Sequence, residues 1–341
     1  MRIHDSHVHV DNSNPQKLIQ MADHFGYEKL CALGIPCGGN RLNNLECLAV
    51  KALAPGRAYA YGGMVYAPTL VPSRESHAEQ LRLMMDAGFD GWKILESKPS
   101  VYRELRLPLD SDAFDGAFSM AEAEGIPVTW HAGDPATFWS EKTAPEFAVK
   151  YHWLCVGEGF PSLETIYAQV ERVLKRHPAL RATLAHLYFT SDDRAHAERL
   201  LDGYENLCFD VTPGSEMYYA FMADAEGWRA FFEKYRFKLV YGTDMVDGED
   251  DVVFGSQDTI TRFVLNVLMK DEPFSVQGFG GTGLGLSEDV LRPLMAENFE
   301  RIAGPKPKAI SKTGVTAYAE WLMPHLDADE RAQAEALLAV F

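Results

Sequence analysis

The chain has 341 residues, of which 47% are hydrophobic, 24% charged and 11% aromatic, a composition typical of a globular protein with a large core. Disordered, collagen-like and coiled-coil classes are thereby excluded. Lys and Arg number 32 against 49 Asp and Glu, and the resulting net charge of −17 would repel a nucleic-acid backbone or an anionic membrane surface. We therefore expect a small-molecule substrate as the partner, with neither nucleic acid nor membrane.

The N-terminal sequence has none of the apolar character of a secretion signal, and no stretch of about 18 apolar residues follows, so we expect a cytoplasmic protein. The 5 scattered cysteines form no Cys-x-x-Cys pair and are interpreted as reduced thiols. Homo-oligomers are common among soluble enzymes, and the sequence leaves the oligomeric state open.

Short apolar runs rich in β-forming residues alternate with helix-like segments along the chain. The candidate strands cover residues 2–10, 29–35, 57–65, 91–96, 126–131, 181–186, 207–211 and 238–243. Strands that alternate with helices predict a parallel sheet, and eight such units favour a closed (β/α)8 TIM barrel of the α/β class over an open sheet. The first expected helix, 15–25, has Asn14 as N-cap, Pro15 in its first turn and Gly26 at its end.

We assign residues 1–272 to the barrel, with a long aromatic-rich loop at 132–161 after the fifth strand. Such a loop favours a lid or wall of the active site, and padding of the barrel or a subunit contact is the alternative. Residues 273–341 are assigned to the same domain, as a Gly-rich loop followed by C-terminal helices that pack on the barrel. The glycine pattern at 278–283 formally matches a dinucleotide-binding fingerprint, but no buried strand precedes it, so we interpret it as a flexible loop.

Metal-competent side chains follow the ends of several predicted strands. His7 and His9 lie two residues apart on the first strand, so both imidazoles point to the same side. His131, His186 and Asp244 end the fifth, sixth and eighth strands, and catalytic residues of a barrel come from such strand ends. Because ions such as Zn²⁺ favour imidazole nitrogen, this set predicts a divalent-metal site, with satisfied polar side chains and no metal as the alternative.

These motifs resemble the amidohydrolase superfamily, and in particular its amidohydrolase-2 branch, which also contains metal-dependent non-oxidative decarboxylases. The resemblance rests on the strand-end motifs and on a trailing helix that often closes such barrels, at residues 5–9, 128–133, 184–186, 241–244 and 294–302. It implies one or two divalent ions, with zinc favoured over manganese, held by His7, His9, His131 and Asp244. His186 is then either a ligand to a second metal or a polariser of the substrate.

The resemblance gives the catalytic roles to Asp244 and His186. In the leading hypothesis, a water activated by the ion attacks an amide, ester or lactone carbonyl, and Asp244 is the general base that passes the proton to the leaving group. The first alternative is decarboxylation of an aromatic or unsaturated carboxylic acid, for which Lys93, Arg103 and Arg106 are the candidate partners of the carboxylate. The second is a non-catalytic metal-binding barrel, which would not need a base beside the ion.

Four residues are candidate substrate contacts: Lys93, His152, Asp210 and Trp139. Lys93 lies on the fourth strand, where binuclear members of the superfamily hold a carboxylated lysine that bridges two metals. A bridging role, a substrate contact and a structural ion pair all stay open for it, and Glu96 is a weaker alternative at the same strand end. Asp210 ends the seventh strand and either contacts the substrate or caps a helix, whereas His152 and Trp139 belong to the long loop.

Overall fold

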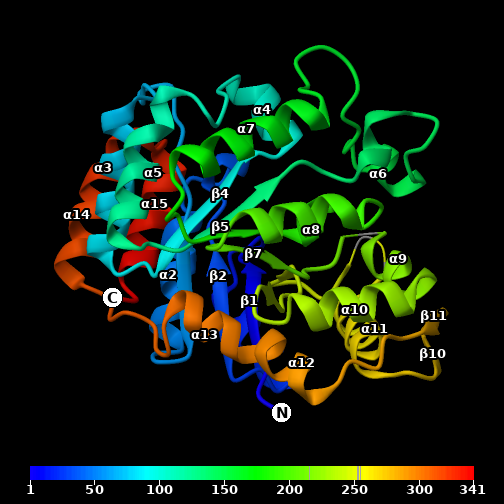
Figure 1. The fold of residues 1–341 in the computed structure, drawn as a ribbon. Helices are drawn as coiled ribbons and strands as arrows, with labels where there is room; N and C mark the ends of the chain where they lie inside the picture. Colours follow the sequence, from blue (N-terminus) through cyan, green and yellow to red (C-terminus); the bar gives the residue numbers. More distant parts are fainter. Residues whose placement is uncertain (215, 252, 254) are drawn as a thin grey trace.

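The structure, a computed structural model, describes residues 1–214, 216–251, 253 and 255–341 (Figure 1). Its main sheet has nine strands in the order β8-β7-β6-β5-β4-β3-β2-β1-β9, and the neighbouring strands run parallel. The strands are β1 (His4–His9), β2 (Lys29–Leu33), β3 (Ala58–Gly62), β4 (Gly91–Ser97), β5 (Val128–Ala132), β6 (Ala182–Leu184), β7 (Leu207–Asp210), β8 (Leu239–Val240) and β9 (Met245–Val246). The α/β TIM-barrel prediction is therefore confirmed, and each expected strand overlaps an observed one.

The barrel closes through the eighth strand position, which the chain fills with two short pieces. β8 pairs with β7, and β9 pairs with β1 a few residues later. Between the pieces, the Ser6 amide donates to the Tyr241 carbonyl at 3.1 Å, and the Asp244 amide donates to the His7 carbonyl at 2.9 Å. The Tyr241 amide turns away and donates to the carbonyl of Leu294 at 3.0 Å. The trailing helical segment thus satisfies a backbone group that an unbroken strand would have paired.

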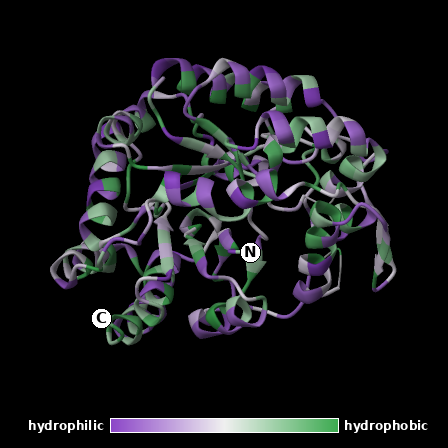
Figure 2. Cartoon of the chain, turned by 60° about the horizontal axis from the view of Figure 1, so that its bottom comes forward, coloured by the Kyte–Doolittle hydropathy of each residue, from purple (hydrophilic) through white to green (hydrophobic). Residues whose placement is uncertain are grey.

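Helices surround the sheet and carry hydrophilic residues beside hydrophobic ones along their length (Figure 2). They are α1 (Pro15–His24), α2 (Asn43–Leu53), α3 (Arg74–Ala87), α4 (Pro99–Leu105), α5 (Asp112–Glu124), α6 (Glu146–Lys150), α7 (Leu163–Arg176), α8 (Arg194–Gly203), α9 (Met217–Ala223), α10 (Ala225–Lys234), α11 (Gln257–Met269), α12 (Glu288–Arg292), α13 (Asn298–Ala303), α14 (Lys312–Leu322) and α15 (Ala328–Leu338). As expected, the Asn14 side chain caps α1 by accepting from the Lys17 amide at 3.2 Å. No helix in the described part of the chain is both long and apolar enough to cross a membrane.

The barrel interior is apolar at its lower end. Alternate residues of β2 and β3 point inward, so that Cys31 and Leu33 meet Tyr59 and Tyr61, and α13 closes this cluster from below with Phe299. The intervening residues face the outer helices and join the larger core. Because this apolar cluster fills the lower end of the barrel, the polar side chains of the interior lie at the C-terminal ends of the strands.

The Gly-rich segment is not the loop we expected. Residues Pro273–Val276 (β10) and Phe279–Thr282 (β11) pair antiparallel in a separate hairpin, which packs against α11 at the right of Figure 1. The two-residue turn has φ of 51° at Gln277 and 91° at Gly278, the positive values that a tight hairpin turn requires. The prediction of a flexible loop was therefore wrong. Gly278 belongs to the tight turn of a hairpin, where its positive φ is required.

The C-terminal helices pack against the outside of the barrel. α14 lies on α3, where a Cβ at Gly314 would come within 2.0 Å of the Asp86 carbonyl oxygen, so only glycine permits this approach. α15 lies on α2, and the Arg41 guanidinium donates to Glu330 of α15 at 2.5 Å. The single helical segment expected at 314–341 is broken between Leu322 and Ala328.

Candidate metal centre

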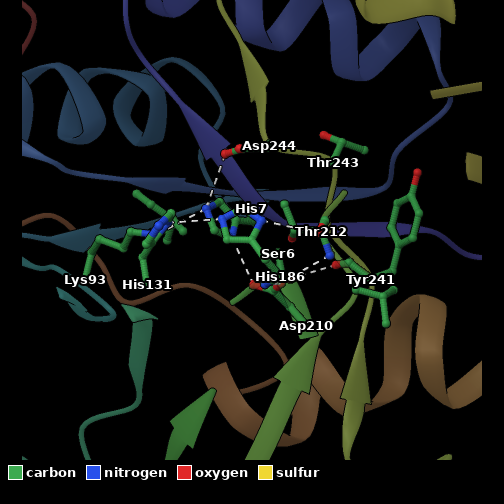
Figure 3. A network of polar contacts seen from close by, with 12 residues as sticks. Ser6, His7, Lys93, His131, His186, Asp210, Thr212, Tyr241, Thr243 and Asp244 are labelled. Carbon is green, nitrogen blue, oxygen red and sulfur yellow. Dashed lines mark hydrogen bonds and ion pairs between the residues drawn. The ribbon is translucent and has the colours of Figure 1, made fainter. Parts of the chain in front are cut away.

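A cavity of about 600 Å³ opens at the C-terminal ends of the barrel strands. His131, His186 and Asp244 line it, and His7 lies beside them (Figure 3). Among the described residues, ligand atoms of His7, His186 and Asp244 all lie within 4.8 Å of one another. The structure thus brings side chains from β1, from the turn after β6 and from the segment between β8 and β9 to one point.

His7 and His9 direct unprotonated nitrogens toward each other. The Nδ1 of His7 lies 2.9 Å from Asp210 Oδ2, and the Nδ1 of His9 lies 2.8 Å from the Leu33 carbonyl oxygen. Since a carbonyl or an ionised carboxylate only accepts, both protons are assigned to Nδ1. The two Nε2 atoms, 3.1 Å apart, then face each other with lone pairs. A cation between or beside them would relieve this repulsion.

His186 and His131 repeat the same arrangement on the other side of the barrel. His186 Nδ1 lies 3.3 Å from the Thr212 carbonyl oxygen, and His131 Nε2 lies 3.0 Å from the carbonyl oxygen of Gly133. The remaining nitrogens, His186 Nε2 and His131 Nδ1, are 3.2 Å apart and carry lone pairs by the same reasoning. Backbone carbonyls therefore set the imidazole tautomers that metal ligation requires.

Asp244 supplies the negative charge of the cluster. Its Oδ1 lies 3.5 Å from His7 Nε2 and 3.3 Å from His9 Nε2, and its side chain is 40% exposed to the cavity. Burial opposes ionisation, but the close contacts with His9, His7 and His186 outweigh it, so that the pKa of Asp244 falls well below its usual value. Asp244 is thus ionised at neutral pH.

Strained backbone holds two of these side chains in place. Asp244 has φ of 60°, and His186 to Phe189 form a left-handed turn with φ of 57°, 51°, 56° and 53°. Left-handed conformations cost non-glycine residues about 1–2 kcal/mol each, so they persist only where other contacts compensate. The His186 amide donates to Asp210 Oδ1 at 2.8 Å, which is one such contact. The strand therefore stops at Leu184, before the position at which we expected it to end.

Asp210 lies behind the imidazoles and away from the cavity wall. Its Oδ2 holds His7, while its Oδ1 accepts from the amides of His186 and Thr212 at 2.8 and 3.1 Å. Burial favours the neutral acid, but His7 and these donors prevail and lower the pKa of Asp210 to about 2. Burial also lowers the pKa of His7 to about 3, with the Lys93 ammonium as the second cause, so the pair is a carboxylate and a neutral imidazole. Neither role expected for Asp210, substrate contact or helix cap, matches this position.

Lys93 is buried beneath the cluster. Its Nζ lies 3.1 Å from His7 Nε2, and desolvation lowers its pKa to about 8. Lys93 is not among the described residues that line the cavity, so this position does not favour a substrate contact. Glu96, at the same strand end, accepts from the Tyr66 hydroxyl at 3.0 Å, and burial raises its pKa to about 7. The bridging role of Lys93 stays a prediction.

The long loop after β5 does form one wall of the cavity, through Phe138, Phe147 and Trp153. Its two other expected contacts lie elsewhere. The Trp139 indole donates to the carbonyl of Pro161 at 2.9 Å, and His152 is exposed; neither is among the described residues that line the cavity. The role of the loop as a wall of an active site stays a prediction, and the side chains that line the cavity are not the two that we named.

The sequence interpretation missed Lys98 and Asp134. Lys98 Nζ lies 2.8 Å from Asp134 Oδ1, the same oxygen lies 3.3 Å from His131 Nε2, and both residues line the cavity. Lys98 follows the end of β4 and Asp134 follows the end of β5, and this position was the available signal. Arg103 and Arg106, the basic residues that we named, are exposed and are not among the described lining residues.

These observations define a class: a TIM barrel whose strand ends present unprotonated imidazoles and a carboxylate to a cavity. A family model described as amidohydrolase matches residues 43–302, and the chain belongs to this family, amidohydrolase-2. The residues that match the family model begin after β1 and do not include His7 and His9. The position of these two histidines in the site is therefore known from the structure alone. Proteins of this family are enzymes that are generally metal-dependent, which agrees with the group of His7, His186 and Asp244.

Two solved structures share the fold. A probable 2-pyrone-4,6-dicarboxylic acid hydrolase from Acinetobacter baumannii, with citric acid bound, aligns with a TM-score of 0.57 and 13% identity over 89% of this chain and 100% of its own. IDCase from Metarhizium anisopliae, in apo form, aligns with a TM-score of 0.52 and 15% identity over 89% of this chain and 97% of its own. A search of curated proteins found no match.

Proposed function

We propose that this protein is a metal-dependent hydrolase of a small-molecule ester, lactone or amide. The observation that carries the proposal is the set of four imidazoles whose protons are held by carbonyls or a carboxylate, so that their free nitrogens converge beside the ionised Asp244. At the His131–His186 pair, two lone pairs face each other at 3.2 Å with no proton between them, whereas at the His7–His9 pair the Lys93 ammonium lies 3.1 Å from His7 Nε2 and leaves the His9 Nε2 lone pair for a ligand. The residues therefore fit a divalent cation.

We assign the ligands as His7, His9, His131 and Asp244, with His186 as a ligand of a second ion or a contact to the substrate. Nitrogen-rich sets favour zinc, and manganese is the alternative. When bound, the ion supplies Lewis-acid polarisation of a carbonyl and activation of water.

The chain's own residues supply the proton transfers and the positioning. Asp244 is ionised and exposed to the cavity, so its free oxygen is placed to take a proton from an attacking water and return it to the leaving group. Asp210 is a positioning residue because it fixes the tautomer of His7 and the backbone of His186. The aromatic wall formed by Phe138, Phe147 and Trp153 excludes water from one side of the substrate.

A second candidate, decarboxylation of a small carboxylic acid, is favoured by one observation. Lys98 is a cation that lines the cavity next to Asp134 and His131, where it could hold a carboxylate. In that reaction, a proton must be delivered to carbon, and Asp244 and His186, which line the cavity, are the candidate donors. Both are unprotonated at neutral pH, since the pKa of each is lowered, which favours the hydrolase.

The experiment follows proton balance during turnover of metal-loaded protein in an unbuffered pH-stat below pH 6. Hydrolysis of an ester or lactone releases a proton, whereas decarboxylation consumes one. We expect proton release with at least one member of a panel of aryl esters and lactones, and loss of that activity in Asp244→Asn. Proton uptake with aromatic carboxylic acids would overturn the proposal in favour of the second candidate, and metal-free protein that fails to bind zinc would overturn both.

A further inference from the structure

We propose that Lys98 is a specificity-determining residue that binds a carboxylate of the substrate, and that the opposite rim of the cavity restricts the far end of the substrate to a neutral or cationic group. The substrate class is therefore a monocarboxylate with an aromatic or apolar body. This inference rests on the proposed function of the same cavity, and it concerns recognition, whichever bond is broken.

Lys98 is built into the cavity wall. Its side chain is 25% exposed, and Asp134, only 6% exposed, holds its Nζ at 2.8 Å. An ammonium has three N–H donors, so the contact with Asp134 orients Lys98 while donors are left for a ligand. Lys98 also lies close to the centre of the site, because the Asp134 oxygen that holds its Nζ is 3.3 Å from His131 Nε2. A substrate carboxylate beside Lys98 would thus lie next to the histidine cluster.

The opposite rim is acidic. Asp11 follows β1, and Glu249 and Asp250 follow β9; all three line the cavity. In the strand order, β1 and the β8–β9 segment lie half a barrel away from β5 and β4, which carry Asp134 and Lys98. Lys17 pairs with Glu249 at 2.7 Å and offsets part of this charge. A second carboxylate pointing to this rim would meet like charge, whereas an ammonium or an amide would not.

Three aromatic residues form a further part of the cavity wall. Phe138, Phe147 and Trp153 come from the loop after β5 and line the same cavity as Lys98. Phe138 and Trp153 stack with a ring separation of 6.5 Å and an interplanar angle of 29°, so they present a wall suited to a flat apolar body. A planar body with one carboxylate is consistent with all three features.

Four benzene derivatives of similar shape test the inference by isothermal titration of the purified protein: benzoate, benzamide, 3-(aminomethyl)benzoate and benzene-1,3-dicarboxylate. We expect benzoate to bind about 10-fold or more tightly than benzamide, since a charge-assisted hydrogen bond is roughly twice as strong as a neutral one. 3-(Aminomethyl)benzoate should bind at least as tightly as benzoate, and the dicarboxylate more weakly. A dicarboxylate that binds most tightly would overturn the assignment of the rim.

Substitutions separate the two ends of the cavity. Lys98→Met should reduce benzoate affinity to that of benzamide, and Lys98→Arg should retain the preference. Lys142→Met, which removes an exposed lysine of the loop after β5, is the control and should change nothing. Asp250→Asn should raise the affinity of the dicarboxylate alone. Unchanged benzoate binding in Lys98→Met would overturn the role of Lys98. Because none of these probes needs to react, that failure is distinct from failure to find hydrolysis.

Discussion

Replacement of Asp210 by Asn tests how the fold prepares the metal centre. The carboxylate accepts from three donors: His7 Nδ1 on one oxygen, and the amides of His186 and Thr212 on the other. Asparagine keeps the shape but must replace one oxygen with an NH₂ group, which faces a donor in either orientation. The orientation with fewer clashes turns the NH₂ toward His7. His7 then has to accept at Nδ1 and carry its proton on Nε2.

That tautomer change removes a lone pair from the metal centre. The proton on Nε2 would point toward His9 and Asp244, 3.1 and 3.5 Å away, where a cation is expected. Loss of such an orienting contact typically weakens metal binding by about 10–100-fold, which corresponds to about 1.4–2.8 kcal/mol. The free energy of unfolding should fall as well, by about 1.5–3 kcal/mol, because a buried charge-assisted hydrogen bond becomes a neutral one.

Two measurements check this prediction. Zinc affinity is determined by competition with a chromophoric chelator, and the tautomer of His7 by ¹⁵N chemical shifts of the metal-free protein. Asp90→Asn is the matched control, since Asp90 is also buried and holds Lys51 Nζ at 2.6 Å outside the cavity. The control should lose stability and keep its zinc affinity. If Asp210→Asn behaved as the control does, with His7 still protonated on Nδ1, the reasoning would be refuted.

Three further predictions concern the base, the ligands and an unrelated buried histidine. Asp244→Asn should lower kcat by about 10²–10⁴-fold, since the amide cannot act as a base. The temperature of thermal unfolding should change little because the side chain of Asp244 is 40% exposed. A variant with the kcat of the wild-type enzyme would exclude Asp244 as the base. His9→Ala should lose bound zinc in elemental analysis, whereas His152→Ala, in the exposed part of the loop, should keep it; equal zinc content in the two variants would contradict the ligand assignment. Burial lowers the pKa of His4 from 6.5 to about 4, so the unfolded chain takes up a proton before the folded protein does, and stability should fall as the pH drops between these values. The free energy of unfolding should fall by about 3 kcal/mol over these two and a half pH units. His4→Phe should remove this pH-dependent loss, as measured by urea titrations at several pH values. An unchanged pH dependence in the variant would contradict the prediction.

The sequence was sufficient to predict the barrel and the members of its central cluster. Alternation of β-rich runs with capped helices is a local pattern, and parallel strands joined by helices have few other arrangements. His131, His186 and Asp244 were found because each closes an apolar run, and the barrel brings such strand ends to one face. Their convergence with His7 needed no knowledge of side-chain conformation.

Contacts between residues far apart in the chain were not predictable in this way. Asp210 and His7 are 203 positions apart, and only the folded barrel shows that one orients the other. The left-handed turn after Leu184 was missed because its residues have no glycine to indicate positive φ, and tertiary hydrogen bonds hold it. The hairpin at 273–282 was missed because its glycines were interpreted as a loop signal.

The sequence by itself determined the fold class and which metal-competent side chains stand at the strand ends, because hydrophobic periodicity and the residue types at strand ends are local properties. The tertiary structure decided which side chains face the cavity, which hold the imidazoles in one tautomer, and where positive and negative charge lie around the rim. Lys98 and Trp153 line the cavity, whereas Lys93 and Trp139 do not. Two lysines, or two tryptophans, of the same region differ in this way because the direction of the backbone and the packing around it decide where each side chain points. Both depend on contacts made by the whole folded chain.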